Sequence, residues 1–295
     1  MARSSPTDPS PTPTGNSSSS SSSASNSSSD PPASPRGTFI VFEGIDRSGK
    51  SSQTAALCSR LTTAGVPVVL KRFPDRTTST GKMISAYLEN TAQTKAERIR
   101  NGAASDAAAD ATAEETELSD QAIHVLFSTN RWEAQTAIKR LLRQGTTVIA
   151  DRYAYSGVAY TAAKFTTSAT NPTTSTEDSQ PPPTATNFYN TLSWCKNADR
   201  GLLTPDVVVF MDIDPAVAAA RAEYGNERYE KIEFQRGVAS IFEVLGEEEG
   251  VGRWKKVDAA RSAEEVKEGV WGVVEPVMQR VAAERRGCRE DLWLD

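Results

Sequence analysis

The sequence predicts an α/β fold of three layers, in which a five-stranded parallel sheet is flanked by helices. Two observations indicate this class. The chain contains five short segments with the composition of strands. Between them lie segments whose apolar residues recur at helical spacing, and strands that alternate with helices form parallel sheets. The expected strands cover 38–42, 66–70, 146–150, 205–213 and 253–257.

Capping residues mark several helix boundaries. The first helix should end at Gly65, and a later one at Gly145, because glycine tolerates the left-handed conformation that follows a helix. Ser119, Asp214 and Ser262 stand where an N-cap is needed, and a proline follows Asp214. The expected helices cover 51–61, 80–90, 119–143, 155 onward, 188–197, 214 onward and 262–284.

Composition excludes several classes of protein. The net charge of −5 is not that of a nucleic-acid binder. No run of eighteen apolar residues exists, so we expect no transmembrane helix. The three cysteines are scattered, which suits a reducing compartment and forms no metal-binding motif. His124 is the only histidine, which argues against Ser-His-Asp chemistry, and we expect it to be a helix-face residue.

A phosphate-binding loop occupies Gly44 to Ser51, which fits the pattern G-x-x-x-x-G-K-[ST]. It lies between a predicted strand and a predicted helix, as the motif requires. The glycines allow backbone N–H groups to point at an anion, and the helix adds the positive end of its dipole. Lys50 supplies a charge for the outer phosphates, and the Ser51 hydroxyl is a ligand for Mg²⁺. The chain is therefore expected to bind a nucleoside triphosphate.

Polar and aromatic residues follow two other strands. Phe73 and Arg76 come after the second strand, where an aromatic ring could pack on a base and an arginine could grip a phosphate. An ordinary solvated loop is the alternative. Asp151 and Arg152 end the third strand, where an Asp lies near the Mg²⁺ of phosphate-loop enzymes. A structural ion pair at the strand end is the alternative.

One helix carries a second candidate for base recognition. Phe127 and Arg131 are four residues apart, so they share a helix face. An aromatic plane beside a forked hydrogen-bond donor could stack on a nucleobase and read its edge. The alternative is a core phenylalanine and a surface arginine.

Four segments in this order resemble thymidylate kinase. They are 39–51, Phe-Pro-Asp-Arg (73–76), Leu-Phe-Ser-Thr-Asn-Arg-Trp-Glu (126–133) and Asp-Arg-Tyr-Ala-Tyr-Ser-Gly-Val-Ala-Tyr (151–160). The resemblance covers about 37–90, 119–165 and 188–285. It implies a P-loop kinase fold and transfer of the γ-phosphoryl group of ATP to dTMP, giving dTDP, a step of dTTP synthesis. It also implies Mg²⁺ as cofactor.

The resemblance assigns roles to individual residues. Asp46 would accept from the sugar 3′-hydroxyl, and Arg47 would stabilise the transferring group. Phe127 would stack on thymine, Arg131 would bond its edge, and Tyr160 would crowd the ribose 2′ position. The expected catalytic residues are Arg47, Lys50, Asp151 and Arg152, and the expected metal ligands are Ser51 and Asp151. The expected ATP-binding residues are Gly44, Asp46, Arg47, Ser48, Gly49, Lys50, Ser51, Ser52, Arg221, Asp258 and Ala259. The expected dTMP-binding residues are Asp46, Phe73, Arg76, Leu88, Phe127, Arg131, Arg152, Ser156, Gly157, Tyr160, Arg228, Tyr229 and Gln235.

The resemblance also indicates how the chain is divided. We expect a kinase domain over 37–285, with a lid at about 221–231 that closes over the substrates. Residues 1–36 form a Ser/Pro-rich segment that cannot bury a core and is expected to be a disordered tail rather than a targeting peptide. The insertions 91–117 and 166–186 are longer than the family's usual loops, and 286–295 is an unassigned C-terminal tail.

Two rival functions are open. A deoxynucleoside kinase must deprotonate a neutral hydroxyl, and Asp75 is the only candidate base at the end of the second strand. A GTPase-like switch should carry an N-K-x-D element, which we do not find. The expected partners are ATP and dTMP, with no nucleic acid and no membrane. Family members are commonly homodimers, and the apolar stripe of helix 119–143 is a possible interface, although core packing explains it as well. The resemblance suggests a cytoplasmic or nuclear enzyme.

Overall fold

The computed structural model describes residues 35–88, 118–168, 185–221, 229, 231–284 and 287–294. The described residues form one compact unit. The expected tail up to residue 34 lies outside the described residues. So do most of the insertions and most of the segment expected to be a lid.

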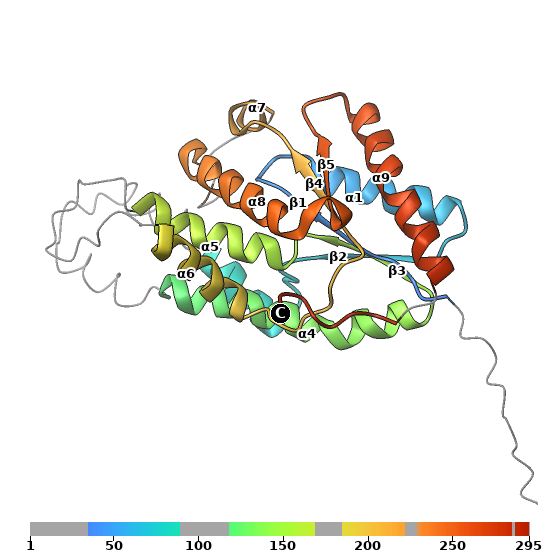
Figure 1. Cartoon of the computed structure of the whole chain (residues 1–295), viewed down its shortest axis with the longest axis horizontal. Helices are drawn as coiled ribbons and strands as arrows, with labels where there is room; N and C mark the ends of the chain where they lie inside the picture. The colour runs from blue at the N-terminus through green and yellow to red at the C-terminus, as the bar shows by residue number, and fades with distance from the viewer. Residues whose placement is uncertain are drawn as a thin grey trace, which may run out of the picture. The chain divides into compact units, whose positions relative to one another are not determined.

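The predicted five-stranded parallel sheet is confirmed. The strands are β1 (Phe39–Glu43), β2 (Val68–Arg72), β3 (Thr147–Asp151), β4 (Val207–Asp212) and β5 (Trp254–Asp258), in the order β2-β3-β1-β4-β5. Every residue of β1 and β3 is buried, because helices cover both faces of the sheet. The central strand β1 therefore leads into the phosphate loop from the middle of the core (Figure 1).

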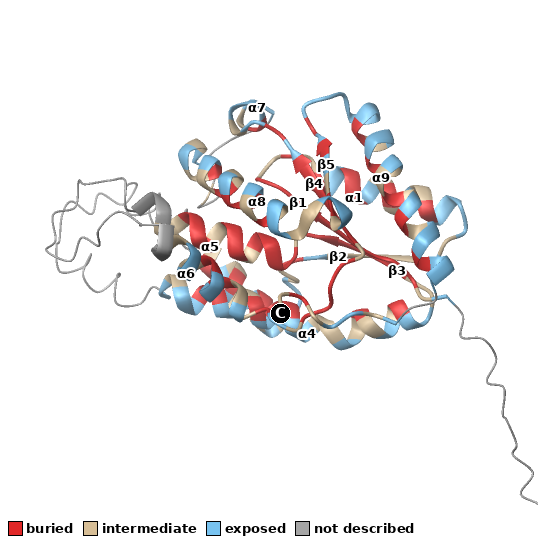
Figure 2. Ribbon diagram, in the orientation of Figure 1, coloured by how far each residue is buried: buried red, intermediate tan, exposed pale blue. Residues whose placement is uncertain are grey.

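Helices form the two outer layers (Figures 1 and 2). Helices α1 (Lys50–Thr63) and α9 (Ala263–Glu284) pack on one face of the sheet. The other face is covered by α4 (Asp120–Arg143), α5 (Ala154–Ser168) and α8 (Ile232–Arg253). The remaining elements are α6 (Ala185–Asn197), which packs on α5, the short α7 (Pro215–Ala219) and a helical segment at 79–88.

The predicted caps are confirmed. Ser119 Oγ accepts from the Ala122 N–H at 3.2 Å, and Asp214 Oδ1 accepts from the Ala216 N–H at 2.7 Å. Ser262 forms a reciprocal capping box with Glu265, whose carboxylate accepts from the Ser262 N–H at 3.1 Å. Gly65 and Gly145 have φ of 75° and 80°, as the helix endings require.

Four strands end one or two residues later than the sequence suggested. Glu43, Arg72, Asp151 and Asp258 are consequently the last residues of their strands. Parallel strands bring their carboxyl ends to one edge of the sheet, so Glu43, Arg72 and Asp151 meet at the edge where ligands bind in such folds.

Helix α8 was not expected from the sequence. Val238, Ile241, Phe242 and Leu245 carry a helical apolar pattern and are buried, but glycines and the run Glu247–Glu249 hide it. The chain leaves helical geometry at Gly250, where φ is 70° and ψ is 165°. The start of α8 reaches the phosphate loop, where Gln235 bonds Asp46.

The C-terminal segment, which had no assigned structure, packs against the domain. The Leu292 N–H donates to the Leu202 carbonyl at 3.2 Å, and the Gly201 N–H donates to the Leu292 carbonyl at 3.0 Å. Leu292 is buried, and the Trp293 ring meets the Tyr155 ring edge-on at 5.4 Å. This segment therefore covers the first turn of α5.

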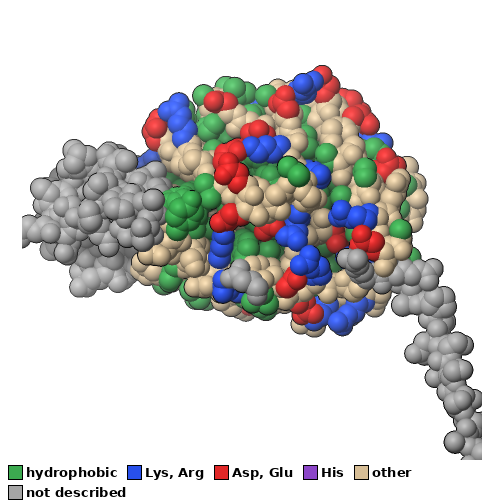
Figure 3. Space-filling model, viewed as in Figure 1, with side chains coloured by type: hydrophobic (Ala, Val, Ile, Leu, Met, Phe, Trp, Pro, Cys, Tyr) green, Lys and Arg blue, Asp and Glu red, His purple; other side chains and the backbone are tan. Residues whose placement is uncertain are grey.

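The surface carries charges of both signs. On the face drawn in Figure 3, Lys and Arg side chains lie among Asp, Glu and hydrophobic ones. Within the described parts of the chain, no helix has the length and apolar character needed to cross a membrane.

The packing of α8 leads to a stability prediction. Phe242 is fully buried, and its ring lies 5.3 Å from that of Phe210. Phe242→Ala should lower the free energy of unfolding by about 3–5 kcal/mol, because it leaves a cavity. Val251→Ala in the same helix is the control, since Val251 is 87% exposed, and it should change stability by less than about 0.5 kcal/mol. Urea denaturation measures both, and equal small losses would contradict the packing described.

Candidate active site

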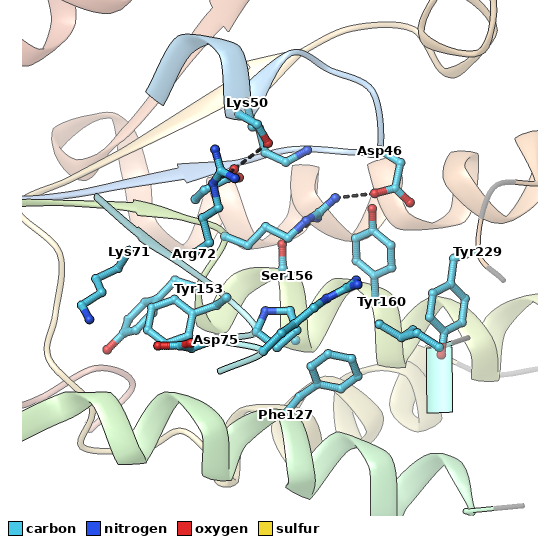
Figure 4. A pocket seen from close by; sticks show the side chains of 18 of the residues that line it. Asp46, Lys50, Lys71, Arg72, Asp75, Phe127, Tyr153, Ser156, Tyr160 and Tyr229 are labelled. Atoms are coloured by element: carbon cyan, nitrogen blue, oxygen red, sulfur yellow. Dashed lines mark hydrogen bonds and ion pairs between the residues drawn. The ribbon is translucent and has the colours of Figure 1, made fainter. Parts of the chain in front are cut away.

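A cavity of about 980 Å³ opens at the carboxyl ends of β1, β2 and β3 (Figure 4). Its size suits a nucleotide ligand or a pair of them. The cavity brings together most of the residues that the sequence and the resemblance had singled out. Those in its wall are Asp46, Arg47, Gly49, Lys50, Ser51, Ser52, Phe73, Arg76, Leu88, Phe127, Arg131, Asp151, Arg152, Ser156, Gly157, Tyr160, Arg221 and Tyr229.

The phosphate loop connects β1 to α1. Gly49 stands at the N-cap of α1 with φ of 89°, and no side chain caps this helix. Its first N–H groups are therefore oriented for an anion. Gly44 has φ of 143°, and a Cβ there would lie 2.9 Å from the Met211 carbonyl, so only glycine fits.

Lys50 folds back on the loop. Its Nζ donates to the Ile45 carbonyl at 2.5 Å and to Ser48 Oγ at 3.2 Å. Burial, with the charge of Arg152, lowers the pKa of Lys50 to about 7. The negative charge of a polyphosphate near Nζ would raise the pKa of Lys50 again and keep its amine charged.

Ser51 and Asp151 meet as expected for a magnesium site. Ser51 Oγ donates to Asp151 Oδ2 at 2.6 Å, although the two residues are far apart in the sequence. Mg²⁺ is commonly held by one or two protein oxygens together with substrate phosphates. A hydroxyl and a carboxylate oxygen at hydrogen-bond distance are oxygen ligands of the kind that Mg²⁺ takes.

Asp46 is held from two sides. Its carboxylate forms an ion pair with Arg152, drawn as a dashed line in Figure 4. Gln235 donates through Nε2 to Asp46 Oδ2 at 2.7 Å and accepts the Asp46 N–H at 2.9 Å. Gln235 Nε2 also donates to the Tyr229 carbonyl at 2.9 Å. The start of α8 is thereby joined to the phosphate loop.

The structure places Gln235 away from the cavity wall. We expected it to close over dTMP, but it is buried and does not line the cavity. Its amide is occupied by Asp46, so it acts on the cavity through that carboxylate. Four residues expected to contact ATP also lie outside the cavity wall, namely Gly44, Ser48, Asp258 and Ala259. Arg228 lies outside the described residues.

Arg152 adopts a left-handed backbone conformation with φ of 68°. Its N–H donates to the Phe42 carbonyl at 2.9 Å, and its Nη1 donates to Ser156 Oγ at 3.1 Å. The guanidinium lies 5.0 Å from the centre of the Tyr160 ring. Burial alone would lower the pKa of Arg152, but Tyr160 and the nearby carboxylates raise it, so the group stays charged.

Glu43 is a site residue that the sequence analysis missed. It is fully buried at the end of β1, and its Oε1 accepts from the N–H groups of Tyr153 at 2.9 Å and Ser156 at 3.1 Å. Its Oε2 accepts from Ser156 Oγ. Burial raises the pKa of Glu43, which the Ser156 hydroxyl and Arg152 partly oppose. The carboxylate caps the start of α5 and holds the strained turn at Arg152.

The far end of the cavity has an aromatic wall. Phe127 points into it from α4 and Tyr160 from α5, with Tyr229 beside them (Figure 4). Phe73 packs against Tyr153, with ring centres 5.6 Å apart. Phe127 and Arg131 share the cavity side of α4, as their spacing predicted.

Arg131 is neither a surface residue nor unpaired. Its Nε donates to Asp199 Oδ1 at 2.9 Å and its Nη2 to Asp199 Oδ2 at 2.6 Å. The sequence gave no sign of Asp199, which lies in a turn after α6. His124 is also buried, between Thr161 and the Cys195 carbonyl, so it is a structural residue of the interior.

The segment after β2 is anchored by Asn130, another residue missed earlier. Its Oδ1 accepts from the Asp75 N–H at 2.7 Å, and its Nδ2 donates to Thr78 Oγ1 at 2.9 Å. Arg76 stays exposed at the cavity wall. Asp75 accepts from the hydroxyl of Thr77 at 2.6 Å, and this bond lowers the pKa of Asp75.

Arg221 links the cavity to the loop after β5. Its Nη2 donates to the Ala259 carbonyl at 2.5 Å, so two residues expected on the ATP side do meet. Asp258 is exposed and pairs with Arg261 at 2.9 Å. Tyr229 stacks on Phe234 at 5.3 Å, which places it against the start of α8.

Comparison with known proteins decides the family. The family model described as thymidylate kinase matches residues 42–113, 102–190 and 183–270. The thymidylate kinase of Arabidopsis thaliana is 41% identical over 240 residues, covering 81% of this chain and 72% of the relative. The chain belongs to the thymidylate kinase family. The Homo sapiens thymidylate kinase is 36% identical over 261 residues, covering 88% of this chain and 99% of the relative.

A solved structure shows the same fold. The Candida albicans thymidylate kinase superposes with a TM-score of 0.62 at 33% identity, covering 84% of this chain and 94% of its own. The thymidylate kinase family model spans the phosphate loop, the segment after β2, α4 and the start of α5. The P-loop kinase fold inferred from the motifs is therefore confirmed.

The buried carboxylate of Glu43 supports a further prediction. Glu43→Ala should lower the free energy of unfolding by on the order of 3 kcal/mol, because two buried backbone N–H groups lose their acceptor. Glu43→Gln should lose less than half of that, since Oε1 can still accept from both and Nε2 can donate to Ser156 Oγ. Urea denaturation of both variants measures this. Equal losses would show that the negative charge, not the acceptor, matters.

Proposed function

We propose that this chain transfers the γ-phosphoryl group of ATP to dTMP, giving dTDP and ADP, a step of dTTP synthesis. The observation that carries this proposal is that one cavity has two chemically different ends. The phosphate loop and the Ser51–Asp151 pair lie at one end, and Phe127 with Arg131 lies at the other. Arg152 stands between them, bound to Asp46. A donor triphosphate and a base-bearing acceptor fit these two ends.

The chemistry needs positioning and charge neutralisation. Lys50 and Arg47 would hold the outer phosphates of ATP. Arg221 and the loop at 258–259 would lie on the side of its adenine. Arg76 and Arg152 would hold the phosphate of dTMP, because guanidinium groups match phosphate oxygens in pairs. These cations would bring two anions together that otherwise repel each other.

Mg²⁺ is the expected cofactor, held by Ser51 and Asp151, and when bound it neutralises charge on the phosphates. The role of Ser51 Oγ is to keep the Asp151 carboxylate turned toward the loop. The roles of the other cavity residues are likewise proposals, supported by their place in the wall.

No general base is required for this acceptor. A phosphate monoester has a second pKa near 6, so it is largely ionised at pH 7. The rival function, phosphorylation of a nucleoside hydroxyl, would need such a base. Asp75 is a poor one, because Thr77 engages its carboxylate and its pKa is lowered.

We also propose that the enzyme is a homodimer. The stripe of α4 singled out earlier, with Ile123, Ile138 and Leu142, is buried within the chain. Another side of α4 offers Val125 and Trp132, which are 50% and 42% exposed and seven residues apart on one helix face. Light scattering of the wild type and of Val125→Glu tests this, and a monomeric wild type would reject it.

The remaining partner and location proposals follow from charge and thiols. The negative net charge supports small-molecule substrates rather than nucleic acid or an anionic membrane. Cys58, Cys195 and Cys288 are all free thiols, which supports a reducing compartment, the cytoplasm or the nucleus.

Product analysis tests the reaction. The chain is incubated with ATP and Mg²⁺ and, separately, with dTMP, dUMP, UMP and thymidine. We expect phosphorylation of dTMP and no phosphorylation of thymidine, because Arg76 and Arg152 would bind an acceptor phosphate and Asp75 is a poor general base for a hydroxyl. Phosphorylation of thymidine but not of dTMP would overturn the proposal in favour of a nucleoside kinase.

The position of Asp46 gives a mutational test. Asp46→Ala should raise the KM for dTMP about tenfold or more, because it removes the proposed partner of the sugar 3′-hydroxyl and releases Arg152. The Kd for ATP should change less than about threefold. Asp46→Asn keeps the size of the side chain and separates the effect of charge. If the KM for dTMP and the Kd for ATP rise by the same factor, Asp46 has no separate role in binding dTMP, and the loop binds ATP alone.

A further inference from the structure

The guanidinium of Arg131 is held unusually firmly for a group at a cavity wall. The side chains of Arg131 and Asp199 are 3% and 0% exposed. Two parallel hydrogen bonds, from Nε and Nη2, fix both the position and the plane of the guanidinium. Asp199 is held in turn by Ser128, whose hydroxyl donates to its Oδ1 at 2.8 Å.

The other side of the guanidinium is closed by α5. A Cβ added at Gly157 would lie 2.6 Å from Arg131 Nη2 and 3.1 Å from Nη1. The group therefore lies between a buried carboxylate and a helix backbone, with no room for another rotamer at that end. Three elements, α4, α5 and the turn after α6, set one orientation.

In that orientation the guanidinium of Arg131 can offer a ligand only hydrogen-bond donors, because arginine has no acceptor. Arginine carries five N–H donors, of which the pair with Asp199 uses one on Nε and one on Nη2. Within the described parts of the chain, Arg131 Nη1 donates to no protein acceptor, and Arg131 belongs to the cavity wall. A ligand atom that meets it must accept a hydrogen bond.

We propose that Asp199 is a positioning residue: it holds Arg131, which the resemblance assigns to the edge of the base, in the one orientation that directs its remaining N–H donors at the group at C4 of the pyrimidine. A carbonyl oxygen, as in thymine and uracil, accepts from the guanidinium. The amino group of cytosine is itself a donor and cannot. The inference rests on the proposed transfer to dTMP and on the base lying at the Phe127 end of the cavity.

The energetic scale makes the effect measurable. A site built to bond one polar group of a substrate can reject the analogue without it by a factor of about 10⁴. Much of that factor depends on holding the donor in place. Asp199→Asn keeps the side-chain volume but offers one acceptor instead of two, so one hydrogen bond of the pair is lost and the plane of the guanidinium is held by one bond instead of two.

The experiment compares kcat/KM for dTMP, dUMP and dCMP at saturating ATP. For Asp199→Asn we expect kcat/KM for dTMP and dUMP to fall about tenfold or more, mainly through KM. The value for dCMP should change less than about threefold, so the ratio of dTMP to dCMP falls about tenfold. The KM for ATP should stay within about twofold, because the pair lies at the acceptor end.

A second variant approaches the same guanidinium from the opposite side. Gly157→Ala leaves Asp199 intact but places a methyl group against Nη2, so the same ratio should fall. This variant decides the matter if Asp199→Asn does not fold. Asp206→Asn is the matched control, since Asp206 forms an equivalent two-bonded pair with Arg36 remote from the cavity. It should lower stability and leave the ratio unchanged.

The outcomes separate the inference from the function. Wild-type turnover of dTMP tests the proposed function in the same assay, and its absence would reject that function. If the wild type is active and the Asp199 and Gly157 variants lose activity on all three nucleotides by one factor, the residues are only structural and the inference is wrong.

Discussion

The buried carboxylate of Glu43 is the contact on which the rest of the site depends. It sits at the end of the central strand and accepts two backbone N–H groups from the first turn of α5. That turn carries Arg152 in a left-handed conformation, which costs free energy and persists only when its surroundings hold it. By tying β1 to the start of α5, Glu43 fixes the distance between the phosphate loop and Arg152.

Asp46 extends this connection to the start of α8. Its carboxylate is shared by Arg152 and Gln235, and Gln235 also bonds the Tyr229 carbonyl. Asp46 of the phosphate loop is thus joined to Arg152 and, through Gln235, to Tyr229, which falls within the segment expected to be a lid. Tyr229, Gln235 and the phosphate loop therefore belong to one hydrogen-bonded network.

Much of the fold and of the site could be predicted from the sequence because the signals are local. Strands, and caps such as Ser119 and Asp214, can be recognised from a few adjacent residues. The loop motif alone pointed to Lys50 and Ser51 as candidate site residues. Helix α8 was missed because its apolar pattern lies among glycines and an acidic run. Glu43, Asn130 and Asp199 were missed for a different reason, since an isolated Glu, Asn or Asp carries no local signal of burial.

The sequence by itself determined the class of fold, the triphosphate loop and the resemblance to one family of kinases. Only the tertiary structure decided which side chains face the cavity. In the folded chain, Gln235 bonds Asp46 and does not line the cavity. Arg131 is buried against Asp199, and Ser51 bonds Asp151. The physical reason is that a charged side chain enters the interior only with a partner, and these partners come from parts of the chain that folding alone brings together.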